Sequence, residues 1–402
     1  MNKQTVKDID IKGKTVLMRV DFNVPLDEKL QITDDSRIVK AMDTVRYILD
    51  QQAKLILMSH LGRPDGKPDP KFSLKPAAER VSKLLNKKVQ LAPDCIGPQV
   101  EALAKALKPG EALLLENLRF HAEEEKNDAA FAKKLASLGD VYVNDAFGTA
   151  HRAHASTEGV TKYLPAVAGF LLGKEVEYFD KILTNPDRPF VTILGGAKVS
   201  DKIKLIGNLI DKSDTLLVGG AMAYTFYKVQ GIAIGNSKFD PAGMDAAKDA
   251  LAKSKAKNVP LVLPVDRVIA QKMEKNVPTK VVNGDIPDGW SGFDIGPESA
   301  KKFKEVLSKA KTILWNGPLG LFEIPPFDKG TREIAEYVAG LSKVTSIIGG
   351  GDTAAAVRIF GLEDKMSHVS TGGGASLEYL EGRVLPGIAA LSDKKPQTAG
   401  KR

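Results

Sequence analysis

The sequence predicts an α/β protein built from two doubly wound parallel-sheet (Rossmann-like) domains joined by a hinge helix. Short apolar runs alternate with helix-like segments along the whole chain, which is the pattern of parallel βαβ units. The 402 residues exceed the roughly 250 to 300 at which a single hydrophobic core stops growing. Hydrophobic residues make up 43% of the chain and charged residues 27%, which is typical of globular domains. Two folded domains are therefore expected.

The predicted strands fall into two groups, one in each half of the chain. In the first half they are Thr15 to Val20, Lys54 to Ser59, Ala112 to Leu115 and Asp140 to Asn144. In the second half they are Phe190 to Leu194, Thr215 to Val218, Pro260 to Leu263, Thr312 to Trp315, Val344 to Ile348 and His368 to Ser370. Each group supplies one parallel sheet, and the segments between strands supply the helices that cover it.

A helix is expected between the two groups. Apolar residues keep helical spacing there, and Pro186 and Pro189 stop the helix. The spaced residues are Val176, Phe179, Ile182 and Leu183. We expect an N-terminal domain over 1–172, an interdomain helix over 173–185 and a C-terminal domain over 186–384. The tail SDKKPQTAGKR is polar and lacks periodicity, so it is expected to be disordered.

Composition and charge exclude several classes of protein. The longest apolar stretches, such as Ala166 to Leu172, are far shorter than the about 20 residues of a membrane helix, and the start MNKQTVKDID has no apolar signal region. The chain has a single cysteine, Cys95, so it cannot form an intrachain disulfide, which is consistent with a reducing cytosol. Cys95 is expected to be a packing residue. The net charge is +8, with acidic and basic residues interspersed. We expect a cytoplasmic protein that binds neither membrane nor nucleic acid.

Arginine recurs after the strands of the first half. Ligands of open α/β sheets bind outside the carboxyl ends of the strands, so these residues share one edge. The segments are Asp21-Phe22-Asn23, His60-Leu61-Gly62-Arg63, Glu116-Asn117-Leu118-Arg119 and the run from Asn144 to Arg152. Guanidinium groups match carboxylate and phosphate oxygens two at a time. One such arginine would be a solvated charge, but several at equivalent strand ends predict a pocket for a small, multiply charged anion.

Glycine recurs after the strands of the second half. The segments are Gly195-Gly196-Ala197-Lys198, Gly219-Gly220-Ala221, Asn316-Gly317-Pro318-Leu319-Gly320, Gly349-Gly350-Gly351-Asp352-Thr353 and Thr371-Gly372-Gly373-Gly374. Glycine lets backbone N–H groups approach an anion closely, and a helix that starts just afterwards adds the positive end of its dipole. An isolated glycine pair is a plain turn; the repeated pattern predicts a phosphate cradle.

The cradle does not match the common nucleotide motifs. The chain contains no G-x-x-x-x-G-K-[ST], H-R-D or D-F-G sequence. Gly349, Gly351 and Ala354 do satisfy G-x-G-x-x-A after a strand, so a nicotinamide dehydrogenase is the second interpretation. No strand-end acid for a ribose hydroxyl follows about 20 residues later, as that fingerprint requires.

Charged residues within the glycine segments indicate how phosphates are held. Asp352 follows the triple glycine, where a carboxylate can bind Mg²⁺ together with phosphate oxygens and waters; the alternative role is an N-cap of the next helix, and both can hold. Lys198 and Lys202 are four residues apart in a predicted helix start. They are expected to share a face and bracket phosphates.

These segments together resemble the phosphoglycerate kinase family over nearly the whole chain, Val6 to about Leu391. The matching blocks are RVDFNVP from Arg19, HLGRP from His60, ENLRF from Glu116, NDAFGTAHRAHAS from Asn144, GGAKVSDKI from Gly195, NGPLGLFE from Asn316, GGGDTAAA from Gly349 and STGGGASLE from Ser370. No block is damaged. A catalytically inactive nucleotide-binding scaffold, the third interpretation, would be expected to show such damage.

The resemblance implies reversible phosphoryl transfer between Mg-ATP and 3-phosphoglycerate, giving ADP and 1,3-bisphosphoglycerate, by a monomer. It implies that the substrate is held by Asp21, Asn23, Arg37, His60, Leu61, Gly62, Arg63, Arg119 and Arg152. The implied nucleotide contacts are Lys198, Lys202, Gly292, Asn316, Pro318, Glu323, Gly350, Gly351, Asp352 and Thr353, with Asp352 as the Mg²⁺ ligand. It also implies that the C-terminal segment 385–402 packs on the N-terminal domain.

The implied chemistry needs no general base. The acceptor is a carboxylate, which is ionised at pH 7 because its reference pKa is about 4. Catalysis then consists of positioning and charge neutralisation. The groups expected to stabilise the phosphoryl in flight are Arg37, Lys198, Gly351, Gly372, Gly373 and Gly374. His60 is expected to be a substrate ligand and the other histidines structural, and the two domains are expected to close around the substrates.

Overall fold

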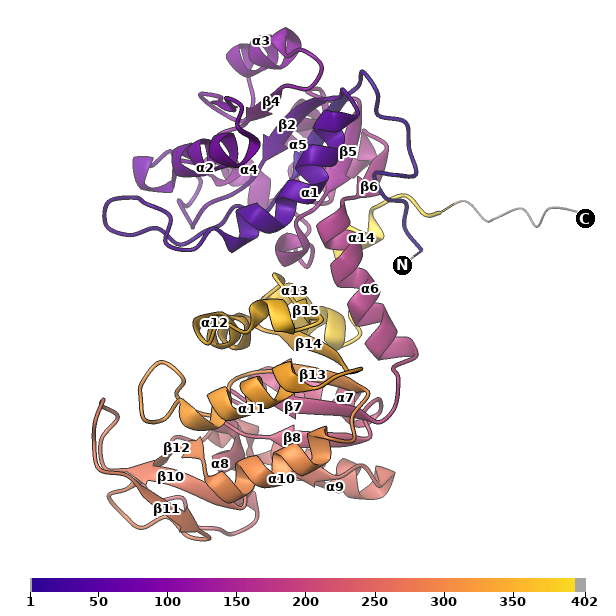
Figure 1. The fold of residues 1–402 in the computed structure, drawn as a ribbon. Coiled ribbons are helices and arrows are strands. Elements are labelled where there is room, and N and C mark those ends of the chain that lie inside the picture. The colour runs from indigo at the N-terminus through magenta and orange to yellow at the C-terminus, as the bar shows by residue number, and fades with distance from the viewer. Residues whose placement is uncertain (1, 395–402) are drawn as a thin grey trace, which may run out of the picture. The chain divides into compact units, whose positions relative to one another are not determined.

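The computed structural model describes residues 2–394. They form two compact units: one takes its described residues from Met1–Glu177 and Val384–Arg402, and the other is Tyr178–Arg383. Each unit has a parallel sheet with helices against it (Figure 1). The predicted fold class, two parallel-sheet α/β domains, is confirmed. Within residues 2–394 no helix combines the length and the apolar character that a membrane span requires.

A six-stranded parallel sheet of order β3-β4-β2-β1-β5-β6 forms the centre of the first unit. Its strands are β1 (Thr15–Arg19), β2 (Lys54–Met58), β3 (Gln90–Leu91), β4 (Ala112–Leu114), β5 (Val141–Asn144) and β6 (Ala166–Ala168). Its helices are α1 (Ser36–Asp50), α2 (Lys75–Leu85), α3 (Pro98–Ala106), α4 (Ala122–Glu125), α5 (Ala129–Ala136) and α14 (Pro386–Ala389). Strands β3 and β6 were not predicted, because each is very short and β6 consists mostly of alanine, which has low β-propensity.

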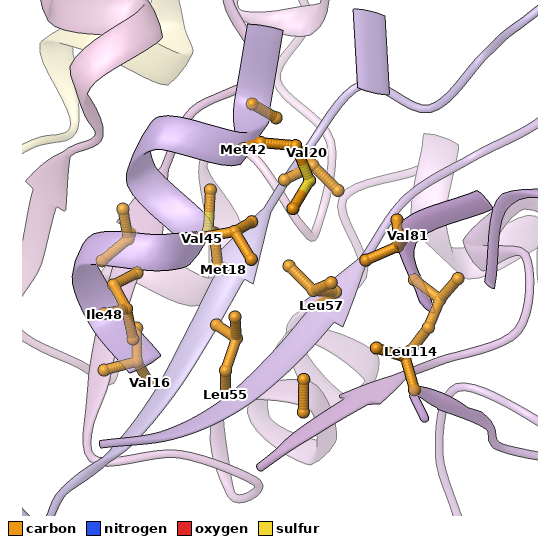
Figure 2. Packing of buried hydrophobic residues seen from close by; sticks show 14 of the residues in the cluster. Val16, Met18, Val20, Met42, Val45, Ile48, Leu55, Leu57, Val81 and Leu114 are labelled. Atoms are coloured by element: carbon orange, nitrogen blue, oxygen red, sulfur yellow. The ribbon is translucent and has the colours of Figure 1, made fainter. Parts of the chain in front are cut away.

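Helix α1 covers one face of this sheet because its apolar residues recur at helical spacing. Met42, Val45 and Ile48 point toward the side chains of β1 and β2, as Figure 2 shows. The facing strand residues are Val16, Met18, Leu55 and Leu57. Burial of each such side chain contributes about 1.5–3 kcal/mol. This packing fixes the start of α1, and with it Arg37, relative to the sheet.

The second unit contains another six-stranded parallel sheet, of order β15-β14-β13-β7-β8-β9. Its strands are β7 (Phe190–Leu194), β8 (Thr215–Val218), β9 (Leu261–Val262), β13 (Thr312–Asn316), β14 (Thr345–Gly349) and β15 (His368–Val369). The helices of this unit are α7 (Ile203–Ile210), α8 (Met222–Val229), α9 (Met244–Lys257), α10 (Pro297–Leu307), α11 (Lys329–Gly340), α12 (Gly351–Ile359) and α13 (Gly374–Leu380). These six strands were all predicted, with small differences at their ends.

A three-stranded antiparallel sheet, which was not predicted, also lies in the second unit (Figure 1). Its order is β11-β10-β12, and its strands are β10 (Asp266–Ala270), β11 (Lys280–Asn283) and β12 (Ser291–Ile295). Strand β10 begins with two charged residues, Asp266 and Arg267, that the fold buries. Buried charges are exceptions to the apolar pattern by which strands are found.

Helix α6 (Phe170–Thr184) runs from the first unit into the second. It begins ahead of residue 173, where the interdomain helix is expected. Its first N–H groups are held by distant side chains: Phe170 donates to Oγ1 of Thr44 at 3.0 Å and Leu172 to Oδ1 of Asp145 at 3.1 Å. Caps that come from other parts of the chain leave no local sequence signal.

The two ends of the described chain meet in the first unit. Ser392 donates from its backbone to Ala166 at 2.9 Å and accepts from Gln4 at 2.8 Å, and Nζ of Lys3 lies 2.8 Å from Oδ1 of Asp393. The yellow C-terminal segment accordingly lies beside β6 in Figure 1. The expectation that the tail from residue 392 is disordered was therefore wrong for 392–394. The rest of that tail, 395–402, lies outside the described residues.

Candidate functional site

The first unit brings the predicted anion-binding segments to one edge of its sheet. Strands β4, β2, β1 and β5 are neighbours and all parallel, so their carboxyl ends lie together. Asp21 follows β1, His60 follows β2, Arg119 follows β4 and Arg152 follows β5. The edge therefore carries polar side chains from four separate strand ends, two of which supply an arginine.

Direct contacts join three of these segments. Nη1 of Arg37, in the first turn of α1, donates to Oδ2 of Asp21 at 2.8 Å. Oδ1 of Asn23 accepts from the backbone N–H of Gly62 at 2.9 Å, and Asn23 itself donates from its backbone to Oδ1 of Asp21 at 3.2 Å. Asp21 and Asn23 thus fix Arg37 and the loop after β2 in relation to one another.

Arg119 is held within the same edge. Its Nη1 donates to the carbonyl of Gly62 at 2.9 Å, and its Nε lies 3.2 Å from Oε1 of Glu125. Only 6% of its surface is exposed, and this burial lowers the pKa of Arg119. Asn117 supports the loop by donating from Nδ2 to the carbonyls of Leu61 and Phe72 at 2.7 and 2.8 Å. The guanidinium is therefore fixed in place and only partly neutralised.

His60 is buried, and its hydrogen-bonding neighbour is the guanidinium of Arg19. Its Nδ1 lies 3.2 Å from Nη2 of Arg19. Burial, followed by the charges of Arg19 and Arg119, holds the pKa of His60 well below its usual value. The ring is neutral at pH 7. Leu61, also predicted at the site, packs its side chain into the hydrophobic core, so that only its backbone is available to a ligand.

Two other predicted arginines are less constrained. Arg63 is exposed and has no hydrogen-bond or ion-pair partner in the described part of the chain. Arg152 is half-buried, and its Nε lies 3.2 Å from Nε2 of His151. Burial and the neighbouring arginines lower the pKa of His154 to about 4. Among residues 2–394, no carboxylate forms an ion pair with Arg63 or Arg152.

A buried network beneath this edge was not predicted as part of the site. Arg19 is 1% exposed and donates from Nε to Oγ of Ser156 at 2.9 Å. Ser156 donates from Oγ to Oε1 of Glu124 at 2.5 Å and from its backbone to Oε2 at 3.0 Å. Glu124 is fully buried, which raises its pKa. One feature of the sequence could have revealed this network: Arg19 lies in an otherwise apolar strand. A buried arginine requires a buried counter-charge.

In the second unit the glycine segments lie at the carboxyl ends of β7, β8, β13, β14 and β15. They contact one another through the backbone: Gly196 donates to the carbonyl of Pro318 at 3.0 Å and Gly220 to that of Leu319 at 3.0 Å. Gly317 donates to Oγ1 of Thr353 at 2.6 Å. A Cβ at Gly195 would lie 2.1 Å from the carbonyl oxygen of Pro318, so the loops approach more closely than a side chain would permit.

Lys202 and Asn316 lie within this set of loops. Nζ of Lys202 donates to the carbonyls of Gly195 at 2.7 Å and Asn316 at 3.1 Å, and to Oδ1 of Asn316 at 2.8 Å. Burial lowers the pKa of Lys202 to about 8. Nδ2 of Asn316 is buried without a hydrogen-bond partner among the described residues. It is a donor in position for an added acceptor.

Lys198 does not share a helical face with Lys202, contrary to the sequence-based expectation. It lies in an irregular, exposed segment ahead of the short 3₁₀ helix Ser200–Lys202, and α7 begins only at Ile203. Gly195 and Gly196 precede this segment, and glycine disfavours helix. The helical structure therefore begins only after Lys198. The Lys198 side chain is consequently free to reach a ligand.

Two helices begin at glycine segments of this edge. Gly350 has φ +84° and precedes Gly351, where α12 begins, and Asp352 is exposed in the first turn. Gly373 has φ +48° and precedes α13, which begins at Gly374. Such φ values favour glycine. The start of each helix leaves backbone N–H groups without intrahelical partners.

The structure places Gly292 and Glu323 outside the glycine segments. Gly292 lies on β12 and donates to Oγ of Ser237 at 2.9 Å; a Cβ there would lie 1.9 Å from the hydroxyl of Tyr224. Glu323 is exposed in the turn that follows β13. In the described part of the chain, neither residue makes a hydrogen bond to the glycine loops.

Comparison with known proteins decides the family. The family model described as phosphoglycerate kinase matches residues 6–383 of the chain. The chain belongs to the phosphoglycerate kinase family. A phosphoglycerate kinase from Fervidobacterium nodosum is 56% identical over 401 residues, which cover 99% of this chain and 100% of that protein. A chloroplastic phosphoglycerate kinase from Arabidopsis thaliana is 55% identical, covering 99% of this chain and 84% of that protein.

Solved structures of the phosphoglycerate kinase family agree in fold. The structure from Coxiella burnetii has a TM-score of 0.88 at 45% identity and covers 96% of this chain and 98% of that chain. The structure from Pyrococcus horikoshii has a TM-score of 0.84 at 32% identity, with the same coverage of both chains. The chain is accordingly a kinase, a phosphotransferase, and the dehydrogenase interpretation of its triple glycine is set aside.

Proposed function

We propose that the chain catalyses reversible phosphoryl transfer between Mg-ATP and the carboxylate of 3-phosphoglycerate, giving ADP and 1,3-bisphosphoglycerate. The observation that supports this most strongly is the pair of complementary sheet edges, one cationic and one lined by glycine. The test is a coupled assay with 3-phosphoglycerate, Mg-ATP and an NADH-consuming partner enzyme. NADH consumption that depends on both substrates is expected. Its absence in folded protein would favour an inactive scaffold, and direct NAD reduction would favour a dehydrogenase.

On the cationic edge, Arg37, Arg63, Arg119 and Arg152 bind the two anionic ends of phosphoglycerate. Asp21 and Asn23 orient Arg37 and the loop 61–63 through the 2.8 and 2.9 Å contacts and accept from the substrate hydroxyl. Neutral His60 offers a single ring nitrogen to the ligand, since its Nδ1 faces Arg19. An Arg→Lys change would lose the bidentate match to carboxylate and phosphate.

On the glycine edge, the nucleotide phosphates lie against the starts of α12 and α13. The unpartnered Nδ2 of Asn316, the exposed Lys198 and the backbone N–H groups from Gly350 to Thr353 donate to phosphate oxygens. Lys202 neutralises phosphate charge from within the loops. Pro318, Gly292 and Glu323 line the part of the site for the rest of the nucleotide, where Gly292 leaves the space that a side chain would fill.

Asp352 holds Mg²⁺ in this proposal. Its carboxylate is exposed and makes no hydrogen bond or ion pair with other described residues, so an oxygen ligand is available, as Mg²⁺ prefers. The ion neutralises negative charge on the nucleotide phosphates. The alternative role of Asp352 as a helix cap is not supported, because α12 has no side-chain cap hydrogen bond.

The transfer step needs electrostatic stabilisation and no general base. The acceptor carboxylate is already ionised, and the one histidine among the predicted substrate ligands, His60, has a depressed pKa. Arg37, Lys198 and the N–H groups of Gly351 and Gly372 to Gly374 stabilise the charge on the oxygens of the transferred phosphoryl. These groups belong to different units.

The proposal therefore requires the two units to approach one another when both substrates are bound, which also excludes water. Small-angle scattering should show a smaller radius of gyration with 3-phosphoglycerate and an unreactive Mg-ATP analogue than with either alone. An unchanged radius would contradict this step.

We further propose that the kinase acts as a cytoplasmic monomer. A single buried cysteine suits a reducing compartment. Sedimentation at several concentrations tests the monomer, and fractionation of the source cells tests the location; chloroplastic relatives make the second measurement informative.

A further inference from the structure

A cluster of three metal-ligating side chains lies in the first unit, outside the substrate and nucleotide residues. Asp94, Cys95 and His121 each offer one ligand atom, and these atoms all lie within 4.8 Å of one another. Asp94 and Cys95 belong to the loop between β3 and α3, and His121 lies between the 3₁₀ helix Leu118–Phe120 and α4. Residues far apart in sequence are thus brought to one place by the fold.

The cluster is already organised by hydrogen bonds. Oδ1 of Asp94 lies 2.7 Å from Nε2 of His121 and accepts from the backbone N–H of Cys95 at 2.6 Å. The ring of His121 packs at 5.3 Å between centroids against Phe131, which limits its rotation. Cys95 is fully buried, whereas the side chains of His121 and Asp94 are 25% and 43% exposed. The cluster therefore has a buried sulfur side and an open side that water can reach.

We propose that Asp94, Cys95 and His121 bind one Zn²⁺ ion, with water in the fourth position. Thiolate, imidazole and carboxylate are the three ligand types of zinc sites, and three protein ligands with one open position form a recognised tetrahedral arrangement. Mg²⁺ and Ca²⁺ prefer oxygen ligands alone. The site would consequently not compete for the Mg²⁺ that accompanies the nucleotide.

Binding forms a sulfur–zinc bond and releases the thiol proton of Cys95 to solvent; the other two ligands bind as the Asp94 carboxylate and the His121 imidazole. Without a cation the thiol stays protonated, because burial and the nearby Asp94 and Glu124 raise the pKa of Cys95 well above its usual value. The charge of the ion offsets those carboxylates and favours the thiolate.

The position of the cluster gives the ion a structural effect on the substrate edge. Glu116, which begins the segment that follows β4, donates from its backbone to the carbonyl of Asp94 at 3.3 Å, and His121 is two residues after Arg119. An ion would therefore join the loop after β3 to the segment that carries Arg119. Binding to the folded state alone raises the melting temperature by mass action.

Cobalt spectroscopy tests the site in the full, metal-free chain. Because Cys95 is the only cysteine, a thiolate-to-Co²⁺ charge-transfer band in the near ultraviolet can come from no other residue. We expect the band to saturate at one Co²⁺ per chain, to disappear on addition of Zn²⁺ and to persist in excess Mg²⁺. Absence of the band in folded wild-type protein would overturn the proposal.

Variants of the three ligands distinguish a specific metal site from nonspecific metal binding. Asp94→Asn and His121→Asn should each weaken Co²⁺ binding roughly tenfold or more, since each removes one of three ligands. Asp128→Asn is the matched control, because Asp128 is an exposed aspartate of the same unit that caps α5, and asparagine caps equally well. Cys95→Ser should lose the band. Wild-type affinity in both Asp94→Asn and His121→Asn would show that the cluster is an ordinary His–Asp pair beside a packing cysteine.

Discussion

Lys202 donates from Nζ to Oδ1 of Asn316 at 2.8 Å, and Nδ2 of the same Asn316 side chain is left buried without a partner among the described residues. One amide therefore holds the lysine on one side and presents a donor on the other. Burial lowers the pKa of this lysine to about 8. The pair is expected to make nucleotide binding sensitive to pH.

Nucleotide phosphates favour the charged form of Lys202. Above a pH of about 8 the free protein has lost this charge, so a bound anion must restore the proton. We expect the affinity for Mg-ADP, measured by calorimetry, to be level below pH 8 and to fall above it. Lys202→Arg should remove the decline, because a guanidinium stays charged. A decline that persists in Lys202→Arg would assign the effect to another group.

Arg37→Ala should act on the chemical step. Removing a group that stabilises transition-state charge costs about 3 kcal/mol, or roughly a hundredfold in kcat. The affinity for ADP should change little, because Arg37 belongs to the first unit. Arg80→Ala is the matched control: Arg80 is also paired with an aspartate, Asp35, at 2.6 Å. Loss of ADP affinity with near-normal kcat would contradict the assigned role.

Glu124→Gln should destabilise the first unit. Ser156 donates to both carboxylate oxygens of Glu124, so glutamine keeps one of these acceptors, loses the other and removes the negative charge near the buried guanidinium of Arg19. Removing the charge that offsets a buried guanidinium costs about 3 kcal/mol, measured as the change in the free energy of unfolding in denaturant. The adjacent exposed Glu123 is the control, and Glu123→Gln should stay within about 0.5 kcal/mol of wild type. Equal stability of both variants would mean that Glu124 carries no charge in the folded protein.

Asp145 should make stability fall as pH rises toward neutrality. Burial raises the pKa of Asp145 to about 7 from an ordinary value of 3.8, so the folded state keeps a proton that the unfolded chain releases between those values. Stability from this group is complete below about pH 4 and is lost as the pH rises through about 7.

Asp145→Asn removes that proton-linked contribution. Between about pH 4 and pH 8, the difference in unfolding free energy should shift in favour of the variant, on the order of 2–4 kcal/mol. Denaturant titrations at a series of pH values measure it, with the exposed Asp50→Asn as control. A difference that stays constant with pH would mean that Asp145 is ionised throughout.

Gly195→Ala should disrupt the nucleotide loops. The added Cβ would meet the carbonyl oxygens of Pro318 and Gly317 at 2.1 and 2.5 Å, both of which belong to the backbone. We expect a lower melting temperature and weaker Mg-ADP binding. Gly207→Ala is the control, because Gly207 lies in α7 and, apart from its chain neighbours and the backbone of its own helix, no atom of the described residues lies within 4 Å of its Cβ position. It should stabilise the protein by about 0.5–1 kcal/mol. Equal effects would contradict the close-approach argument.

The parallel sheets could be predicted because their signals are local. A buried parallel strand is a continuous apolar run, and Phe190–Leu194 and Thr215–Val218 are found at the predicted bounds. The antiparallel strand β10 could not be found in this way, since it starts with buried Asp266 and Arg267. The start of α6 was also missed, because Thr44 and Asp145 cap it from distant parts of the chain.

The strand-end residues of the candidate site could be predicted from the sequence, but the buried residues that support them could not. Strand-end arginines and glycines are visible in the sequence because parallel strands place their carboxyl ends together. The supporting contacts depend on three-dimensional neighbours: Glu124 looks like any residue of an acidic run, yet the fold buries it beside Ser156. The contact between Lys202 and Asn316 likewise depends on the end of β13, which is distant from Lys202 in sequence.

The joining of both chain ends in the first unit has a consequence for synthesis. Tyr178–Arg383 is a continuous segment, so it can fold as soon as it has left the ribosome. The other unit receives the segment that pairs with Gln4 and Ala166 only after the whole of Tyr178–Arg383 has been made. Because domains generally fold as units during synthesis, the unit Tyr178–Arg383 should reach its native state first in the nascent chain, and the unit whose synthesis began first should be completed last.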